Sequence, residues 1–161
     1  SSMPTGVKIS GLYTTSILAK TEALAAGFDE AILLNQDGSV SEGSGENLFM
    51  IRDGAIITPG ETDNCLLGIT RDSVIQLARE ELSMEIIQRH IHRSELYLAD
   101  EVFLTGTAAH LTAVGELDNR SIGSGETGPV TKKLQDIYFS TVIGDNVRYE
   151  DWCTMVSPSG G

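Results

Sequence analysis

The chain has 161 residues, of which 40% are hydrophobic and 21% are charged, a balance that is ordinary for a globular domain and shows no sign of disorder. A single domain of this length buries about two thirds of the surface that its unfolded chain exposes. The formal net charge of −12 argues against non-specific nucleic-acid binding, which needs a surplus of Lys and Arg. No apolar run approaches the roughly 20 residues that cross a membrane, so no membrane span is expected.

The first half of the chain is predicted to contain a helix followed by short strands. Residues 12–26 are predicted to form the helix, because apolar residues can share one broad face and Gly27 is a suitable stop. Residues 31–34 are predicted to be a short buried strand that ends in turn-forming residues 35–38. Residues 39–47 are rich in Gly and Ser, and we expect a loop that is too polar for a core.

A hairpin and a second helix are predicted next. Residues 48–51 and 55–58 are expected to be its two strands, because the Asp53-Gly54 pair between them is a strong hairpin signal. After a loop at residues 59–65, residues 70–82 are predicted to form a helix. Its inner side is expected to carry the apolar side chains of Val74, Ile75, Leu77 and Ala78.

The second half continues the alternation of strands and helices. Residues 84–91 are predicted to be a strand, residues 93–98 a short helical turn, and residues 101–105 a buried strand. Residues 111–114 and a polar turn near residues 118–119 indicate a further hairpin.

The last helix is predicted at residues 129–143, where Pro129 takes an allowed first-turn position. Trp152, the only tryptophan, is expected to dock on the body of the protein. Since strands alternate with three longer helices, the sequence predicts a mixed α/β domain.

Three loops of small residues are candidates for ligand binding: residues 41–47, 67–71 and 104–109. The second loop places Gly68-Ile69-Thr70 at a helix start, where free backbone N–H groups and the helix dipole favour an anion. The third loop places Gly106 just past a strand, with no side chain to block a ligand. These loops indicate a ligand with a phosphate or carboxylate, although Gly and Thr also serve as plain turn and cap residues.

The order of these motifs resembles that of class IV aminotransferases, closest to the branched-chain amino-acid aminotransferases. The resemblance rests on GVKISGLY at residues 6–13, SEGSGEN at 41–47, GITRD at 68–72 and LADEVFLTGTA at 98–108. It implies the large domain of a fold-type IV pyridoxal-phosphate enzyme, an α/β fold with a mixed sheet or pseudo-barrel and flanking helices. Residues 1–161 would form this C-terminal cofactor-binding domain, and a small N-terminal domain would be absent from the chain.

The resemblance implies roles for three side chains near the cofactor ring. Lys8 stands where the family lysine bonds to the aldehyde of pyridoxal 5′-phosphate and then moves a proton as general base and acid. Glu42 matches the glutamate that pairs with the pyridine nitrogen, although Glu46 competes for that role on chemistry alone. Tyr13 matches the tyrosine that hydrogen-bonds the ring hydroxyl. Taken alone, Lys8 would be a surface lysine and Tyr13 a core aromatic.

The resemblance also implies which residues hold the phosphate and the substrate carboxylate. The expected cofactor-binding residues are Leu66, Gly68, Ile69, Thr70, Gly106 and Thr107. The N–H groups of Thr107 and Ala108 would bind the substrate carboxylate. Arg71 is expected to face away from the site and to pair with a surface acid.

Some positions depart from the family pattern. Leu67 stands where a proline is common, His110 where a carboxylate is common, and Leu12 where a polar residue is usual. These differences leave the substrate preference open more than cofactor binding. His90 and His92 form an HxH pair without an evident third ligand, so no metal site is predicted.

The implied activity is transfer of an amino group between a branched-chain L-amino acid and 2-oxoglutarate. Alternatives on the same fold are a D-amino-acid aminotransferase, an amine transaminase and an aminodeoxychorismate lyase, and a non-catalytic binding module is an alternative of another class. The family's N-terminal domain would supply an arginine for the phosphate and much of the side-chain pocket, and a homodimer is usual.

The cellular location is predicted from the cysteines and the N-terminus. Cys65 and Cys153 show no CxxC spacing, which argues against a disulfide framework or a cysteine zinc site and favours a reducing compartment, the cytoplasm. Residues 1–6 lack the basic-then-apolar pattern of a signal peptide.

Overall fold

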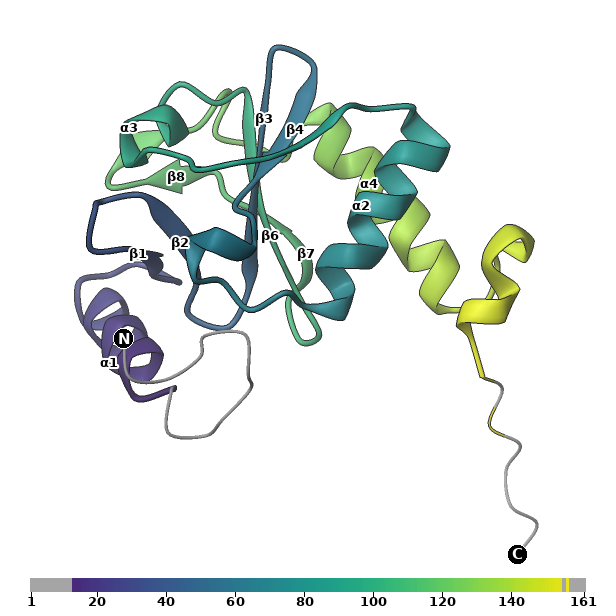
Figure 1. The fold of residues 1–161 in the computed structure, drawn as a ribbon, viewed down its shortest axis with the longest axis horizontal. Coiled ribbons are helices and arrows are strands. Elements are labelled where there is room, and N and C mark those ends of the chain that lie inside the picture. The colour runs from purple at the N-terminus through teal and green to yellow at the C-terminus, as the bar shows by residue number, and fades with distance from the viewer. Residues whose placement is uncertain (1–12, 155, 157–161) are drawn as a thin grey trace, which may run out of the picture.

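A computed structural model describes residues 13–154 and residue 156, and their core is a five-stranded mixed sheet (Figure 1). The strand order is β5-β4-β3-β6-β7, with β4 and β5 parallel and the other neighbours antiparallel. The sheet strands are β3 (Asn47–Arg52), β4 (Ala55–Thr58), β5 (Ile86–Gln88), β6 (Glu101–Gly106) and β7 (His110–Ala113). The helices are α1 (Tyr13–Ala25), α2 (Ile69–Leu82), α3 (Arg93–Leu96) and α4 (Pro129–Val142).

Two small antiparallel sheets and two 3₁₀ helices complete the described fold. One sheet pairs β1 (Ile32–Leu34) with β2 (Val40–Gly43), and the other pairs β8 (Glu116–Leu117) with β9 (Arg120–Ser121). The 3₁₀ helices span Glu61–Asp63 and Val147–Trp152. The expected α/β fold with a mixed sheet and flanking helices is therefore confirmed.

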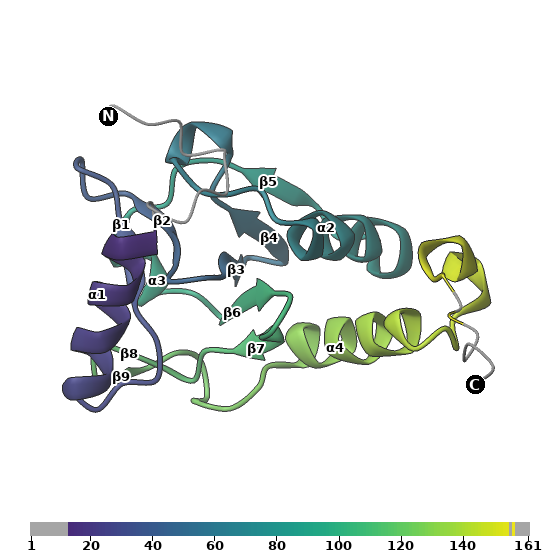
Figure 2. The same cartoon turned by 90° about the horizontal axis from the view of Figure 1, so that it is seen from below.

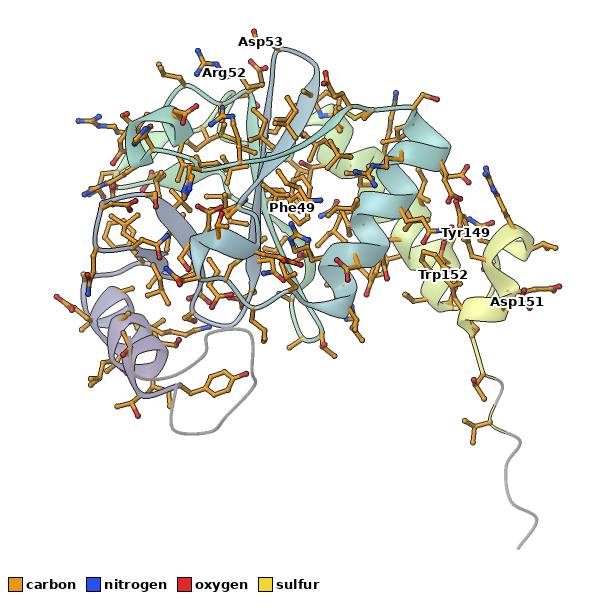
Figure 3. The ribbon with its side chains drawn as sticks, in the orientation of Figure 1. Phe49, Arg52, Asp53, Tyr149, Asp151 and Trp152 are labelled. Carbon is orange, nitrogen blue, oxygen red and sulfur yellow. The ribbon has the colours of Figure 1, made fainter. Side chains whose placement is uncertain are left out.

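Side chains of the sheet alternate between two apolar layers, as the period of a strand requires. Phe49 packs with the helices on one face, and its ring stacks on Phe103 with centroids 4.9 Å apart. Figure 3 shows Phe49 near the centre of the molecule, beside α2. Leu48 and Met50 belong to a second buried cluster on the other face. Both faces of β3 are therefore buried.

Helices α2 and α4 lie side by side against one face of the sheet (Figures 1 and 2). The side chains predicted for the inner side of α2 are all buried there: Val74, Ile75, Leu77 and Ala78. The N-terminus of α4 is held by buried Glu101 of β6, whose carboxylate accepts from Val130 N at 3.0 Å and Thr131 N at 2.8 Å. This contact joins the first turn of α4 to the sheet.

Several predictions about the elements are confirmed. The β3–β4 hairpin turns at Asp53 and Gly54, which both have positive φ angles of 52° and 77°. The helices α2 and α4 and the short helix α3 lie where the sequence predicts them. The predicted polar turn at residues 118–119 joins β8 to β9, whereas the strand predicted at residues 111–114 is β7 and pairs with β6 instead. Trp152 packs on Tyr149 of its own 3₁₀ helix with ring centroids 4.8 Å apart (Figure 3), but it is 41% exposed, so its docking on the body stays a prediction.

Other predictions about the elements are wrong in whole or part. The strand predicted to be buried at residues 31–34 is β1, none of whose residues is buried, and Leu34 is 43% exposed. Residues 39–47 are not a polar loop, because Val40–Gly43 form β2, and Ser39, Ser41 and Asn47 are buried. The strand predicted over residues 84–91 shrinks to Ile86–Gln88. The first helix is present as α1, but no described residue of it is buried, and Ile17, Leu18 and Leu24 are exposed by 62%, 65% and 56%. Leu12 lies outside the described residues.

Within the described residues, no helix has both the length and the apolar character that a membrane crossing requires.

Candidate active site

The three small-residue loops meet around one cavity of about 570 Å³. It lies between the start of α1, the β2–β3 connection, the start of α2 and the end of β6. Every described residue that the sequence predicts for the site lines this cavity: Tyr13, Glu42, Leu66, Gly68, Ile69, Thr70, Gly106, Thr107 and Ala108. The structure thus brings together residues that are almost a hundred positions apart. Lys8 lies outside the described residues, so its placement stays a prediction.

Glu42 is a partly buried carboxylate at one side of the cavity. Its Oε2 accepts a hydrogen bond from Leu66 N at 2.9 Å. Burial raises the pKa of Glu42, the Leu66 N–H acts in the opposite direction, and the charge of Glu46 raises it further. No Lys, Arg or His among residues 13–154 forms an ion pair with Glu42. A cationic group in the cavity would therefore stabilise the ionised form of Glu42.

The N-terminus of α2 forms another part of the wall. Its N-cap is Gly68, a residue without a side chain that could cap the first turn. Thr70 is buried in this turn, while Ile69 is 80% exposed. Free N–H groups at a helix start attract an anion, and the helix dipole adds to that attraction.

The end of β6 adds a buried hydroxyl to the same cavity. Thr105 lines the cavity and is 1% exposed, yet its Oγ1 has no hydrogen-bond partner among the described residues. An unpaired buried hydroxyl costs about 1–3 kcal/mol.

Gly106 lies where the third loop meets the first. A Cβ atom on Gly106 would lie 3.2 Å from Gly45 O and 3.3 Å from Glu46 Cγ. This spacing is tighter than ordinary van der Waals contact. Glycine at position 106 therefore allows two loops of the cavity wall to pack directly on each other.

Glu46, the competitor of Glu42, also lines the cavity but bonds to its own loop. Its Oε2 accepts from Gly45 N at 3.1 Å. Burial raises the pKa of Glu46, and Glu30 raises it further by its charge and a hydrogen bond. Glu30 in turn pairs with Lys20 of α1 at 2.8 Å. Glu46 is thus part of a charged network between the β2–β3 connection and α1, the helix that carries Tyr13.

The sequence was compared with models of known protein families. The family model described as Amino-transferase class IV matches residues 2–117 of the chain. The chain belongs to the class IV aminotransferases.

Relatives and solved structures agree with this membership. The chain is 57% identical over 155 residues to a probable branched-chain-amino-acid aminotransferase of Aquifex aeolicus, covering 96% of this chain and 50% of the relative. It is 48% identical to the branched-chain-amino-acid aminotransferase of Pseudomonas aeruginosa, covering 94% of this chain and 49% of the relative. The branched-chain amino acid aminotransferase of Thermobaculum terrenum in its PLP-form superposes with a TM-score of 0.92 at 44% identity, covering 95% of this chain and 50% of that one. The chain spans about half the length of these relatives.

Arg71 of this class IV chain supports the start of α2 without lining the cavity. It faces away as expected and lies 3.4 Å from Asp72, but its side chain is only 3% exposed. Its Nη2 donates to Pro59 O and Gln88 Oε1, both at 3.0 Å. The expected pair with a surface acid is therefore present, and Arg71 is in addition a buried link from α2 to the preceding loop and β5.

Two residues of the cavity wall, Asn47 and Thr105, received no role from the sequence. Asn47 is 6% exposed, and its amide bonds to the backbone of Leu66 and Gly68. The partners of Asn47 lie about twenty positions away, so no local pattern indicates them. Thr105 stands directly before Gly106 in the TGTA motif, and this position in a family motif could have indicated that Thr105 lies in the cavity wall.

The histidines lie away from the cavity. His90 contacts the buried carboxylate of Asp63 through Nδ1. No group of three potential metal ligands occurs within residues 13–154 and 156. His110, one of the departures from the family pattern, has a φ of 54° and its ring lies 5.5 Å from that of Phe139.

Proposed function

We propose that the chain is the cofactor-binding part of a branched-chain amino-acid aminotransferase, which transfers an amino group from a branched-chain L-amino acid to 2-oxoglutarate. The observation that carries the proposal is the cavity that joins a helix N-terminus with a glycine N-cap to a partly buried carboxylate. The names of the relatives support the substrate class. Two solved structures of another branched-chain amino acid aminotransferase, 50% identical to this chain, hold 4-methylvaleric acid and pyridoxamine 5′-phosphate respectively.

The residues present fit pyridoxal 5′-phosphate. The start of α2 would hold the phosphate through the backbone N–H groups of Ile69 and Thr70 and the Thr70 hydroxyl, and Thr107 would complete these contacts. Glu42 would pair with the protonated ring nitrogen, and Tyr13 would donate to the ring hydroxyl. When bound, the cofactor supplies a ring that accepts the electron pair released as a substrate loses its α-proton.

Each side chain then has a defined task. Glu42 would keep the ring nitrogen protonated through its negative charge, and its bond to Leu66 N holds the carboxylate in place. Lys8 would bond to the cofactor and move the proton to and from the substrate α-carbon. Thr107 and Ala108, which line the cavity, would bind the substrate carboxylate through backbone N–H groups.

The relatives are about twice as long as this chain, and the part of them that it does not match suggests a second domain as a partner of the cavity. We propose that a smaller N-terminal domain completes the cavity with an arginine and side-chain contacts, and that the enzyme is a homodimer. We also propose the cytoplasm as its location, supported by two cysteines that are free of disulfides. Sedimentation of the protein expressed from its complete gene tests the dimer.

A substrate panel tests the function. The protein from the complete gene is incubated with pyridoxal 5′-phosphate, 2-oxoglutarate and either L-leucine, D-alanine or a simple amine, and glutamate formation is measured. L-Leucine should be the preferred donor. Preference for D-alanine or for the amine would refute the branched-chain assignment, and cofactor binding without turnover of any donor would favour a binding module.

Lys8→Ala tests the catalytic residue in the same assay. The expected result is loss of glutamate formation and of the absorbance that accompanies covalent attachment of the cofactor. Lys132→Ala is the matched control, because Lys132 is an exposed lysine of α4 that pairs with Asp136 at 2.6 Å. Equal activity of the Lys8 and Lys132 variants would exclude Lys8 from the reaction.

A further inference from the structure

The two ends of the β2–β3 connection both bond to the segment that leads into α2. Glu42, on β2, accepts from Leu66 N at 2.9 Å. Asn47, the first residue of β3, donates from Nδ2 to Leu66 O at 2.6 Å and accepts from Gly68 N at 3.2 Å through Oδ1. Two side chains thus occupy both backbone groups of Leu66 and the N–H of the α2 N-cap.

Asn47 is well placed to fix this segment. It is 6% exposed and belongs to the central strand β3, where it pairs with Thr105 of β6. Its amide also touches the helix start, because a Cβ on Gly68 would lie 2.7 Å from Asn47 Oδ1. The sheet therefore fixes the position of the Asn47 amide, and the amide in turn fixes the position of Gly68, the residue before α2.

These hydrogen bonds affect how the protein would hold the ring and the phosphate of one cofactor molecule. Under the proposed function, Glu42 meets the ring nitrogen and the N-terminus of α2 meets the phosphate. These two groups are at fixed positions on the cofactor, so the protein must hold the two sites at a matching separation. The segment from Leu66 to Gly68 connects them, and Leu67 within it is 36% exposed and lacks the fixed φ of a proline.

We infer that Asn47 is a positioning residue that fixes the phosphate-binding N-terminus of α2 relative to Glu42 by bonding Leu66 O and Gly68 N. This inference rests on the proposed function. Asn47 acts through the backbone of its partners, so its removal should weaken recognition of the phosphate more than recognition of the ring.

The first experiment compares pyridoxal 5′-phosphate with pyridoxal, which lacks the phosphate. Dissociation constants are measured for the wild-type protein, Asn47→Ala and Asn35→Ala. Asn35 is the matched control, because it also bridges a backbone carbonyl, Asp63 O at 3.0 Å, but does not line the cavity. Loss of two hydrogen bonds should raise the Kd of Asn47→Ala for pyridoxal 5′-phosphate by roughly tenfold or more, with a much smaller change for pyridoxal. Asn35→Ala should change neither constant appreciably.

A double-mutant cycle with Gly68→Ala provides a second measurement. The new methyl group would press on the Asn47 amide, so Gly68→Ala alone should weaken binding of pyridoxal 5′-phosphate. In the Asn47→Ala background the same change should cost much less, because the group it presses on is gone. Asn47→Asp, which keeps the acceptor for Gly68 N but loses the donor to Leu66 O, serves if Asn47→Ala does not fold, and it too should weaken the phosphate-bearing ligand selectively.

The outcomes separate the two claims. Wild-type protein that binds no pyridoxal 5′-phosphate refutes the proposed function. Wild-type binding together with an Asn47 variant that loses both ligands equally, or neither, overturns the positioning role alone. Strict additivity of the Asn47 and Gly68 changes would also overturn it.

Discussion

Replacing Glu42 by Gln separates its charge from its hydrogen bond. Glu42 Oε2 accepts from Leu66 N at 2.9 Å, and a glutamine carbonyl can accept the same bond, so the backbone contact is retained. The negative charge that the proposal places opposite the ring nitrogen is lost. Since a hydrogen bond to a charged group contributes about 1.5–3 kcal/mol, Glu42→Gln should weaken binding of pyridoxal 5′-phosphate by roughly 10- to 100-fold.

The same substitution should have the opposite effect on the cofactor-free protein. Burial raises the pKa of Glu42 above its ordinary value, so the folded state favours the protonated carboxyl. The stability from this group is fully present below the unfolded pKa and is lost as the pH rises through the folded pKa. Glu42→Gln should therefore raise the melting temperature of the free protein at neutral pH, and the gain should fade on acidification.

Thermal unfolding at neutral and acidic pH, with and without pyridoxal 5′-phosphate, measures both effects. Glu46→Gln is the control, because burial raises the pKa of Glu46 as well while the proposal gives Glu46 no contact with the ring nitrogen. It should stabilise the free protein and leave cofactor affinity nearly unchanged. A Glu42→Gln protein that loses stability at neutral pH and binds the cofactor normally would refute the reasoning. Loss of affinity in Glu46→Gln alone would assign the ring nitrogen to Glu46.

Three further predictions concern other parts of the fold. Glu101→Ala leaves Val130 N and Thr131 N without their acceptor, and it should lower the free energy of unfolding by about 1–3 kcal/mol in urea titrations; an unchanged midpoint would show that water replaces the carboxylate. Gly106→Ala brings a methyl group to 3.2 Å from Gly45 O, so it should weaken cofactor binding in absorbance titrations, and wild-type affinity would mean that the loops yield freely. Burial raises the pKa of Cys65 to about 11, so at neutral pH a thiol reagent should label the half-buried Cys153 first, as read by peptide mass spectrometry; faster labelling of Cys65 would contradict its burial.

Local patterns predicted the elements whose partners lie close in sequence or repeat with a regular period. Asp53-Gly54 indicated the β3–β4 hairpin because both residues tolerate the positive φ angles that its turn requires. The apolar spacing of α2 indicated its buried side because helical periodicity alone determines that face. These features depend on few long-range contacts.

Elements that are stabilised by polar contacts between residues far apart in the chain could not be predicted from local sequence patterns. Ser41 is buried in β2 because its hydroxyl donates to Asn64 O at 3.2 Å, a partner 23 positions away. Composition alone made residues 39–47 look too polar for a core. For α1, periodicity indicated an apolar face, but it cannot reveal what covers that face, and within the described residues nothing buries it.

The candidate site was more predictable than the strands around it. Its loops carry family motifs, and the structure brings the described motif residues to one cavity. Arg71 and Asn47 differ, because their roles depend on backbone carbonyls of Pro59 and Leu66 that no motif specifies. Hydrogen bonds from side chains to distant backbone therefore account for most of what the sequence left open in the site.

The central claim is that this cavity holds pyridoxal 5′-phosphate bound covalently to Lys8. In the most direct measurement, the protein is incubated with the cofactor, and borohydride reduces the carbon–nitrogen double bond between cofactor and lysine to a stable single bond. Peptide mass spectrometry then locates the modified lysine. The account predicts a phosphopyridoxyl group on Lys8 in the wild-type protein and a loss of specific labelling in Lys8→Ala. Labelling of a different lysine, or equal labelling of both proteins, would contradict it.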